Sequence, residues 1–495
     1  MNIITIDLGT TNIKVSAYNR ALTPLTTLSH NVIYQRHNEW VEFDAEAWFD
    51  RIIEMVNQAG SAAKKINGGD VVQIVLTGQA ESLVLLDGAE KVIRPAISWL
   101  DMRSRNECAE LASVFNIEQG YQITGQPEII PTWPITKMLW LNRHENETFK
   151  RTRYFLLLKD YIIFRLSGRM AGDYSIYSFS YYFNITQKTY WQEILDYCSV
   201  STQQLPEVLP SCTLAGTLLT ALTQTDCGLT PATKINVGTL DHFAGMIGTG
   251  NIQEGIISES AGTVLSLATL VSTPDFSLGR LPLNCGPFPD SYVLLPVCES
   301  GGFSLEWYKN TFWPEASFAD INQAISEKNP TTPPVFLPYL TGVNAPEFDE
   351  HASGVFFGIH ASHGKEDFAL AIMQGVACLL RKNIEYMTQA GIKVNKIISV
   401  GGGAKSPLWN QIKSDFTHQT FEIPENEEAA SFGAAIIGAV SEGYFPSFVR
   451  AVEEKIKIKH VYMPAERQDY EATWGVFSTL YAALGEVYVL NAHRR

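Results

Sequence analysis

The segment Asp7-Leu8-Gly9-Thr10-Thr11, with Lys14 three residues later, carries the groups that a triphosphate needs. Gly9 lets the backbone approach a ligand closely, and the hydroxyl and amide groups of Thr10 and Thr11 can donate to phosphate oxygens. Lys14 adds positive charge, and Asp7 can hold a hydrated Mg²⁺ ion. Because a plain hairpin turn could carry the same glycine, phosphate binding depends on a second signal elsewhere in the chain.

That second signal lies about half a chain downstream. The segment Gly255-Ile256-Ile257-Ser258-Glu259-Ser260 leads into Ala261-Gly262-Thr263, and the strand-like segment Val264-Leu265-Ser266-Leu267 follows. An acidic residue, a small residue, a Gly-Thr turn and a strand therefore recur, which indicates duplication of one α/β unit. We expect each half of the chain to present one phosphate-facing hairpin.

A run of three glycines supplies a different surface. Gly401-Gly402-Gly403-Ala404-Lys405-Ser406 follows a predicted strand and precedes a helix that contains Trp409. A strand, a glycine turn and a helix start predict a flat platform without side chains, on which a purine ring can lie. The run is not a P-loop, because that motif requires glycine where Ala404 stands.

The elements that must position these turns follow an alternating pattern. The segment from residue 3 to 17 predicts a hairpin, strands are expected at 71–76 and 396–400, and the clearest helices are 45–59, 368–389 and 408–417. Alternation of strands and helices is typical of α/β layers. A chain of 495 residues exceeds the size of one core, so we expect two domains, 1–245 and 246–495, with a cleft between them.

Composition excludes several classes of protein. A formal charge of -15 and the absence of any Lys/Arg run argue against a nucleic-acid partner. No apolar run is long enough to span a membrane, and the N-terminus reads as a strand, so no membrane association and a cytoplasmic location are expected. The seven cysteines are scattered without a Cys-x-x-Cys pair, which indicates reduced, structural thiols.

A series of short motifs runs through nearly the whole chain in a fixed order. They are Asp7-x-Gly-Thr-Thr-x-x-Lys14, Gly78-Gln79, Trp99-Leu-Asp101-Met-Arg103, Thr124-Gly125, Lys137-Met-Leu-Trp140, Lys159-Asp160-Tyr161, Gly238-Thr-Leu-Asp241, Ser300-Gly-Gly302, Leu337-Pro-Tyr, Ala352-Ser-Gly354, Gln374-Gly375, Gly401-Gly-Gly-Ala-Lys-Ser406 and Gly433-Ala-Ala435. Each motif is weak alone, but the ordered set resembles the FGGY family of carbohydrate kinases.

The resemblance implies a fold and a reaction. The fold would be two actin/hexokinase-like, ribonuclease H-like α/β domains with a catalytic cleft between them. The reaction would be transfer of the ATP γ-phosphoryl group to a hydroxyl of a small sugar or polyol, assisted by Mg²⁺. Asp241 matches the catalytic aspartate of the family, although an aspartate after a strand can also be a simple helix cap.

The resemblance also assigns binding residues. The first phosphate loop would be formed by Asp7, Gly9, Thr10, Thr11 and Lys14, and the metal would be bound by Asp7 and Asp241. The second phosphate loop would be formed by Gly262 and Thr263. Gly302 and Glu306 would contact the ribose or adenine, and Gly402, Gly403 and Ala404 would form the adenine platform. The substrate residues would be Gln79, Ala80, Glu81, Trp99, Asp101, Arg103, Asp241 and His242.

The substrate itself is left open by these residues. After Gly78-Gln79, xylulose kinases usually have Met-His-Gly and glycerol kinases Arg-Glu-Thr, whereas this chain has Ala80-Glu81-Ser82. The segment from Lys405 to Trp409 is more similar to xylulose kinases, and Asp241-His242 is similar to some fuculose kinases. A ketopentose such as xylulose is therefore favoured, and fuculose, erythritol, gluconate and glycerol remain alternatives.

Two departures from the family pattern support competing hypotheses. Val264 replaces a hydroxyl residue in the second phosphate loop, and Gly342-Val343-Asn344-Ala345-Pro346 lacks the charged pair usual there. They leave room for a sugar-binding regulator, and the two hairpins alone would fit an actin-like ATPase or nucleotide sensor. The segment from Trp99 to Arg103, together with Asp241, favours a kinase with a small-molecule substrate. A homodimer is an open possibility for the assembly.

Overall fold

The computed structural model describes residues 1–262, 264–279, 281–298, 300–328, 332–344, 347–349 and 351–494. The chain forms two compact units that alternate along the sequence. Unit 1 comprises residues 1–252, 271–293 and 428–456, and unit 2 comprises 253–270, 294–427 and 457–495. The division predicted at residue 245 cuts the chain once, whereas two later segments return to unit 1.

Unit 1 is built on a six-stranded sheet in the order β14-β15-β6-β1-β2-β3. The hairpin predicted at the N-terminus is confirmed as β1 (Asn2–Leu8) and β2 (Asn12–Asn19), paired antiparallel, and β1 also pairs parallel with β6 (Val71–Gly78). The remaining strands are β3 (Pro24–Asn31), β14 (Leu214–Thr217) and β15 (Lys234–Leu240). Because β1, β6 and β15 run parallel, their carboxyl ends meet at one edge.

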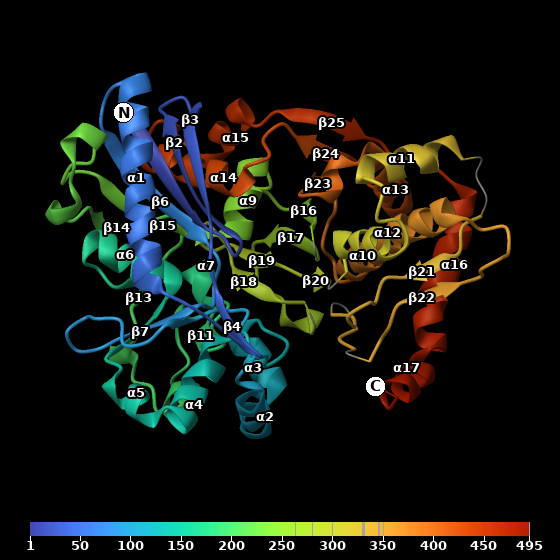
Figure 1. The fold of residues 1–495 in the computed structure, drawn as a ribbon, viewed down its shortest axis with the longest axis horizontal. Coiled ribbons are helices and arrows are strands. Elements are labelled where there is room, and N and C mark those ends of the chain that lie inside the picture. The colour runs from blue at the N-terminus through green and yellow to red at the C-terminus, as the bar shows by residue number, and fades with distance from the viewer. Residues whose placement is uncertain are drawn as a thin grey trace. The chain divides into compact units, whose positions relative to one another are not determined.

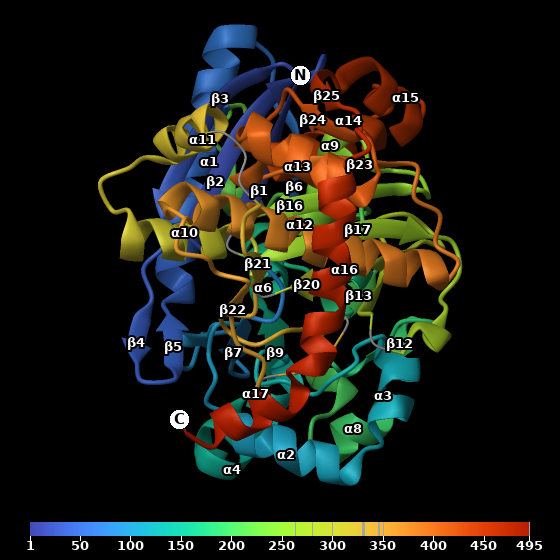
Figure 2. The same ribbon diagram turned by 90° about the vertical axis from the view of Figure 1, so that its right-hand side faces the viewer.

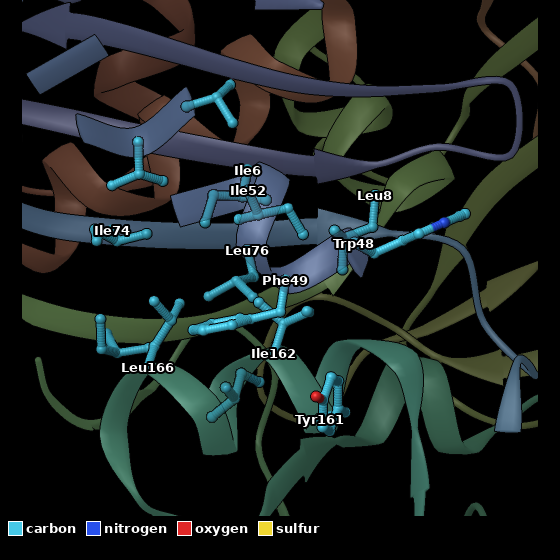
Figure 3. Close-up of a cluster of buried hydrophobic side chains, with 14 of the residues drawn as sticks. Ile6, Leu8, Trp48, Phe49, Ile52, Ile74, Leu76, Tyr161, Ile162 and Leu166 are labelled. Atoms are coloured by element: carbon cyan, nitrogen blue, oxygen red, sulfur yellow. The ribbon is translucent and has the colours of Figure 1, made fainter. Parts of the chain in front are cut away.

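Each face of this sheet buries a different set of side chains. Ile4, Ile6 and Leu8 of β1 pack with the amphipathic helices α1 (Ala45–Asn67) and α6 (Leu158–Ser167) on one face. Figure 3 shows Phe49 and Ile52 of α1 and Ile162 of α6 beside the strand residues Ile6 and Leu76. The alternate residue Ile3 packs with α9 (Asp241–Thr249) and α14 (Ala429–Ser441) on the other face.

The other elements of unit 1 surround this sheet (Figure 1). A five-stranded sheet has the order β4-β5-β8-β7-β9, and two small sheets pair β10 with β13 and β11 with β12. Their bounds are β4 (Gln35–His37), β5 (Trp40–Phe43), β7 (Leu83–Leu86), β8 (Ala96–Ile97), β9 (Tyr154–Leu157), β10 (Ala171–Asp173), β11 (Phe183–Asn184), β12 (Thr189–Tyr190) and β13 (Glu207–Leu209). The helices are α2 (Arg105–Val114), α3 (Ile117–Thr124), α4 (Pro134–His144), α5 (Asn146–Arg151), α7 (Tyr174–Tyr177), α8 (Gln192–Tyr197) and α15 (Phe448–Lys455), and the segment 271–293 adds β18 (Leu283–Cys285) and most of β19 (Tyr292–Leu294).

Unit 2 repeats the hairpin and its parallel neighbour. Strands β16 (Ile256–Ala261) and β17 (Leu265–Val271) pair antiparallel, and β16 pairs parallel with β23 (Lys396–Val400). The sheet continues through β24 (Phe421–Pro424) to β25 (Ile458–Tyr462), and β20 (Val297–Cys298) pairs with β17. This arrangement confirms the second hairpin that the sequence predicts.

Helices and a small sheet complete unit 2. The helices are α10 (Gly302–Phe312), α11 (Phe318–Glu327), α12 (Lys365–Gln389), α13 (Pro407–Thr417), α16 (Gln468–Ala483) and α17 (Gly485–Ala492), and β21 (Val335–Leu337) pairs with β22 (Val355–Phe357). Figure 2 shows α16 running beside α12 and α13. The predicted helices 45–59, 368–389 and 408–417 are all confirmed, with α1 extending eight residues further to Asn67. Among the residues described, no helix is long and apolar enough to cross a membrane.

Candidate active site

The first hairpin turn is held by contacts to its backbone and to Thr10. A Cβ at Gly9 would lie 2.6 Å from the Asn12 carbonyl oxygen, so the close turn requires glycine. Tyr34 donates its hydroxyl to the Thr10 carbonyl over 3.1 Å, and Trp99 Nε1 donates to Thr10 Oγ1 over 3.1 Å. The predicted phosphate turn and the predicted substrate residue Trp99 are thus in direct contact.

The end of β6 brings Gln79, Ala80 and Glu81 beside this turn. Gln79 donates its backbone amide to the Leu8 carbonyl over 3.0 Å. Ser82 N donates to the Ala80 carbonyl over 2.8 Å, which closes a three-residue turn with Glu81 at its centre at φ 65°. Such γ-turns with positive φ are rare and strained, and strain of this kind is concentrated at functional sites.

Asp101 and Arg103 lie behind Trp99, with no exposed side-chain surface. Asp101 accepts from the backbone amide of Val41 over 2.5 Å and from Arg103 Nε over 2.8 Å. The guanidinium also pairs with Glu42 at 2.6 Å and lies 4.1 Å from the ring centre of Trp40. Both Asp101 oxygens and the Nε and Nη2 atoms of Arg103 are engaged in these contacts, which support the Trp99 segment, whereas Arg103 Nη1 is buried without a hydrogen-bond partner among the described residues.

Asp241 stands where β15 ends and α9 begins. The pairing of β15 with β6 is irregular between Asn236 and Thr239, and Gly238 within that bulge has φ 61°. A Cβ at Gly238 would lie 1.7 Å from the Leu76 carbonyl oxygen, so this bulge requires glycine. Bulges redirect a strand at active sites, and here the bulge places the Asp241 carboxylate in the first turn of a helix, where negative charge is favoured.

His242 is the direct partner of Asp241. The Asp241 Oδ1 atom accepts from the His242 backbone amide over 2.7 Å and lies 3.0 Å from His242 Nδ1. Burial opposes ionisation of Asp241, but the charge and hydrogen bonds of His242, with the more distant Lys159, bring its pKa below the ordinary value. The Asp241 side chain keeps 29% of its surface exposed, so an ionised carboxylate is available to a ligand.

Asp7 has the opposite electrostatic character. Burial and the neighbouring charge of Asp241 raise the pKa of Asp7 to about 7, while Lys14 acts in the lowering direction. Asp7 Oδ1 is buried and accepts no hydrogen bond from any residue that the structure describes. Lys14 Nζ pairs with Glu428 at 2.5 Å. An unsatisfied buried carboxylate oxygen beside a second carboxylate is suited to a cation.

Lys137 is a member of the site that sequence reasoning did not assign. It lies on α4, fully buried, and donates Nζ to the Thr132 carbonyl over 2.7 Å. Burial lowers the pKa of Lys137 and raises the pKa of Glu81. The positive charge of Lys137 acts to lower the pKa of Glu81, and the negative charge of Glu81 acts to raise the pKa of Lys137, so each charge partly offsets the effect of burial on the other group. Asp241 and His242 also act on the pKa of Glu81, so these four groups form one cluster. The only sequence signal for Lys137 was its place in a family motif.

In unit 2, three glycine segments converge on the end of β16. Gly302 N donates to the Gly262 carbonyl over 2.6 Å, and a Cβ at Gly301 would lie 2.6 Å from the Val264 backbone. A Cβ at Gly403 would lie 2.7 Å from Ala261 Cβ. The structure therefore brings together the Gly262, Gly302 and Gly403 segments that the resemblance assigned to the nucleotide.

Other assigned nucleotide residues lie on the same elements. Gly402 and Gly403 follow β23, and Ala404 lies in the short turn before α13 and accepts from Asn410 Nδ2 over 2.7 Å. Glu306 is exposed on α10. Thr263 lies outside the described residues, as do Ala345 and Pro346 of the altered Gly342 segment.

Candidate metal ligands are few. Within the described ranges, no group of three or more His, Cys, Asp and Glu side chains could hold a metal ion. His360 and His363 contact each other, as His363 Nδ1 accepts from the His360 backbone amide over 3.1 Å. The carboxylates of Asp7 and Asp241 are thus the pair that the fold offers to a metal bound with its own water or phosphate ligands.

The arrangement can perform a proton transfer beside a phosphate turn. An ionised Asp241 can accept a proton from a hydroxyl of an acceptor molecule. The Glu81 and His242 side chains can form hydrogen bonds with adjacent hydroxyls of the same molecule. Gly9 to Thr11 can donate hydrogen bonds to phosphate oxygens. Each of these groups belongs to unit 1. In unit 2, considered by itself, the Gly262, Gly302 and Gly403 segments form a surface without side chains that suits a flat ring.

Comparison with known proteins bears on this chemistry. The N-terminal domain of the FGGY family of carbohydrate kinases matches residues 2–248, and the C-terminal domain of that family matches residues 280–442. The xylulose kinase of Bacillus subtilis is 31% identical over 97% of this chain and 96% of its own length. The xylulose kinase of Staphylococcus epidermidis is also 31% identical, with 97% of this chain and 96% of that protein covered.

Solved structures agree with the fold. The ligand-bound xylulose kinase of Lactobacillus acidophilus superimposes with a TM-score of 0.91 over 98% of this chain and 99% of that chain, at 23% identity. The predicted two-domain, actin/hexokinase-like α/β fold is therefore confirmed. Two family domains and near full-length similarity together establish that this protein belongs to the FGGY family of carbohydrate kinases and is an ATP-dependent carbohydrate kinase.

Proposed function

We propose that the protein phosphorylates a hydroxyl of a ketopentose, with xylulose as the preferred acceptor and Asp241 as the base. The observation that carries the proposal is the cluster of Asp241, His242, Glu81 and Lys137, in which the charge of Asp241 also acts on Asp7 of the first hairpin. Its charged groups suit a neutral acceptor with several hydroxyls. The similarity to two xylulose kinases supports xylulose over other ketoses.

In the proposed reaction, the acceptor hydroxyl gives its proton to the Asp241 carboxylate as its oxygen bonds to the γ-phosphorus of ATP. The bond between the γ-phosphorus and the bridging oxygen breaks, and ADP leaves with that oxygen. Because the pKa of Asp241 is below its ordinary value, the carboxylate is ionised at neutral pH and ready to accept the proton. His242 fixes its orientation through the 3.0 Å contact.

The donor set fits a magnesium ion, because Asp7 Oδ1 is buried without a partner among the described residues. Asp7 and Asp241 would hold the ion, and when bound it would neutralise charge on the phosphate oxygens. Lys14 and the amides of Gly9 to Thr11 would bind the phosphates from the protein side. The catalytic cleft between the two domains stays a prediction.

Glu81 and Asp241 also bear on the choice of acceptor. Asp241 is ionised, whereas burial raises the pKa of Glu81 to about 8, so a gluconate carboxylate in this cluster would meet the negative charge of Asp241. Ala80 leaves unfilled the place where glycerol kinases carry an arginine, which favours an acceptor larger than glycerol. A neutral five-carbon ketose satisfies both conditions.

The experiment is a coupled ADP-release assay with xylulose, ribulose, fuculose, erythritol, glycerol and gluconate as acceptors. We expect the highest kcat/KM with xylulose. The Asp241→Asn variant, assayed in parallel, is the control for contaminating kinases. We expect Glu81→Ala to raise the KM for xylulose roughly 10-fold or more, since a lost hydrogen bond to a charged group costs about 1.5–3 kcal/mol. A higher kcat/KM for glycerol or gluconate would refute the proposed acceptor.

A further inference from the structure

We propose that Ser175 is a positioning residue for Asp241, and that the buried pair Lys159 and Asp173 holds Ser175 in place. This inference rests on the proposed role of Asp241 as the base. Lys159 lies on α6, Asp173 ends β10, and Ser175 lies on α7, so the three belong to elements that flank the end of β15 in unit 1.

Ser175 contacts the two residues that precede Asp241. Leu240 donates its backbone amide to Ser175 Oγ over 2.9 Å, and Thr239 Oγ1 donates to the same oxygen over 2.9 Å. Thr77 Oγ1 in turn donates to the Thr239 carbonyl over 2.9 Å. The backbone one residue before the catalytic aspartate is therefore fixed by side chains on both sides.

The reason for these side-chain contacts lies in the β15 bulge. The pairing of β15 with β6 is irregular between Asn236 and Thr239 and resumes for only two residues, Thr239 and Leu240, before α9 begins. An amide at a helix start has no acceptor within the helix. The Ser175 hydroxyl supplies an acceptor for the Leu240 amide at this junction.

Ser175 is itself oriented by a buried carboxylate. Its hydroxyl donates to Asp173 Oδ1, which also accepts from the Ser175 backbone amide over 3.0 Å and from Ser211 Oγ over 2.8 Å. Asp173 Oδ2 pairs with Lys159 Nζ, and neither charged side chain has any exposed surface. With its proton committed to Asp173, the Ser175 hydroxyl can act toward Leu240 and Thr239 only as an acceptor.

A buried charged pair is weak evidence for stability, because desolvation offsets most of its attraction. We infer instead that the pair serves to orient Ser175. Lys159 holds one Asp173 oxygen, and the other oxygen accepts from the Ser175 hydroxyl and so fixes its direction. Small displacements of a reacting group reduce phosphoryl transfer steeply. The network therefore sets the place of the Asp241 carboxylate relative to the acceptor.

The test compares Ser175→Ala and Ser175→Cys with Ser211→Ala as a matched control. Ser211 Oγ donates to the same Asp173 oxygen and accepts from the Ser175 backbone amide over 3.3 Å, but within the described structure it makes no hydrogen bond to Leu240 or Thr239. The readouts are the single-turnover rate of phosphoryl transfer, the KM values for ATP and the sugar, and the melting temperature. Cysteine keeps the packing of Ser175 and supplies only a weak acceptor.

We expect Ser175→Ala and Ser175→Cys to slow transfer about 10- to 100-fold at unchanged KM values, and Ser211→Ala to transfer near the wild-type rate. Equal rates for Ser175→Cys and Ser211→Ala would overturn the inference, as would a loss confined to melting temperature. If Asp241→Asn retained turnover, the proposed base would fail instead. An inactive Asp241→Asn with a fully active Ser175→Cys would refute only the positioning role.

Discussion

The two hairpins of the molecule share a backbone plan but use their acidic residues differently. When the Gly9-Thr10 and Gly262-Thr263 turns are aligned, Asp7 of β1 corresponds to Ser260 of β16. The acidic residue of β16 is Glu259, one position earlier and therefore on the opposite face of its strand. One hairpin carries a carboxylate that the charge of Asp241 affects, and the other directs its carboxylate into the core.

The surroundings of the two acids show the consequence. Glu259 has no exposed surface, pairs with Lys413 Nζ at 2.9 Å, and accepts from Ser399 Oγ. Asp7 Oδ1 is buried without a partner in the described part of the chain, and the pKa of Asp7 is raised to about 7. The two units thus share the strand pairing of the hairpin, and of these two acids it is Asp7 in unit 1 that keeps an oxygen without a partner among the described residues.

The largest expected effect comes from removing the base in unit 1. Asp241→Asn should lower kcat about 10²- to 10⁴-fold, the usual contribution of general base catalysis, with little change in ATP affinity. Rapid-quench kinetics and calorimetric ATP titration measure the two quantities separately. A variant with more than about a tenth of wild-type turnover would contradict the assignment of chemistry to unit 1.

Removing the cation that pairs with Glu259 should affect stability and leave chemistry intact. Lys413→Met leaves a buried carboxylate without its cation, which typically costs about 3–5 kcal/mol. Urea unfolding should show this loss, while kcat of the folded protein stays close to wild type. The paired variant Lys413→Met with Glu259→Gln should recover much of the stability. A kcat loss as large as that of Asp241→Asn would contradict the contrast between the two hairpins.

A smaller effect is expected at Lys14. Lys14→Ala should raise the KM for ATP roughly 10-fold and leave the KM for the sugar unchanged, because hydrogen bonds to charged groups contribute about 1.5–3 kcal/mol. Glu428→Gln is the matched control, since it removes the other half of a partly exposed ion pair. That pair contributes at most about 1 kcal/mol to stability. If Lys14→Ala and the wild type had equal KM values for ATP, the turn from Gly9 to Thr11 would be an ordinary hairpin turn without a role in phosphate binding.

A pH-dependent effect on stability is expected at Asp7 in the absence of nucleotide and metal. Its pKa is raised on folding from 3.8 to about 7, so folding disfavours the ionised form and the resulting destabilisation is greatest above pH 7. The destabilisation decreases as the pH falls from 7 toward 4. Asp7→Asn should therefore raise the melting temperature at pH 8 and raise it less at pH 5. A melting-temperature difference that grows toward acid pH would show that Asp7 is stabilised as a carboxylate.

The sequence by itself determined the features that depend on local pattern. Gly9, the repeated Gly-Thr turn and the Gly401 run predicted close backbone turns, because only glycine accepts such contacts. Alternating apolar residues predicted the first hairpin and alternating strands and helices predicted α/β layers, both of which the structure confirms. The assignment of Asp241 as the base came from the family resemblance, because an aspartate after a strand can also be a helix cap, and it stays a prediction.

Only the tertiary structure decided which charged residues are available and which are buried. Lys137 meets the Glu81 cluster from a separate helix, Ser175 reaches Leu240 across 65 positions, and Arg103 lies behind Trp99 with no exposed surface. The return of residues 428–456 to unit 1 is equally invisible in the sequence. Pairing and burial arise from contacts between distant segments, and periodicity along the chain carries no information about which distant segments will meet.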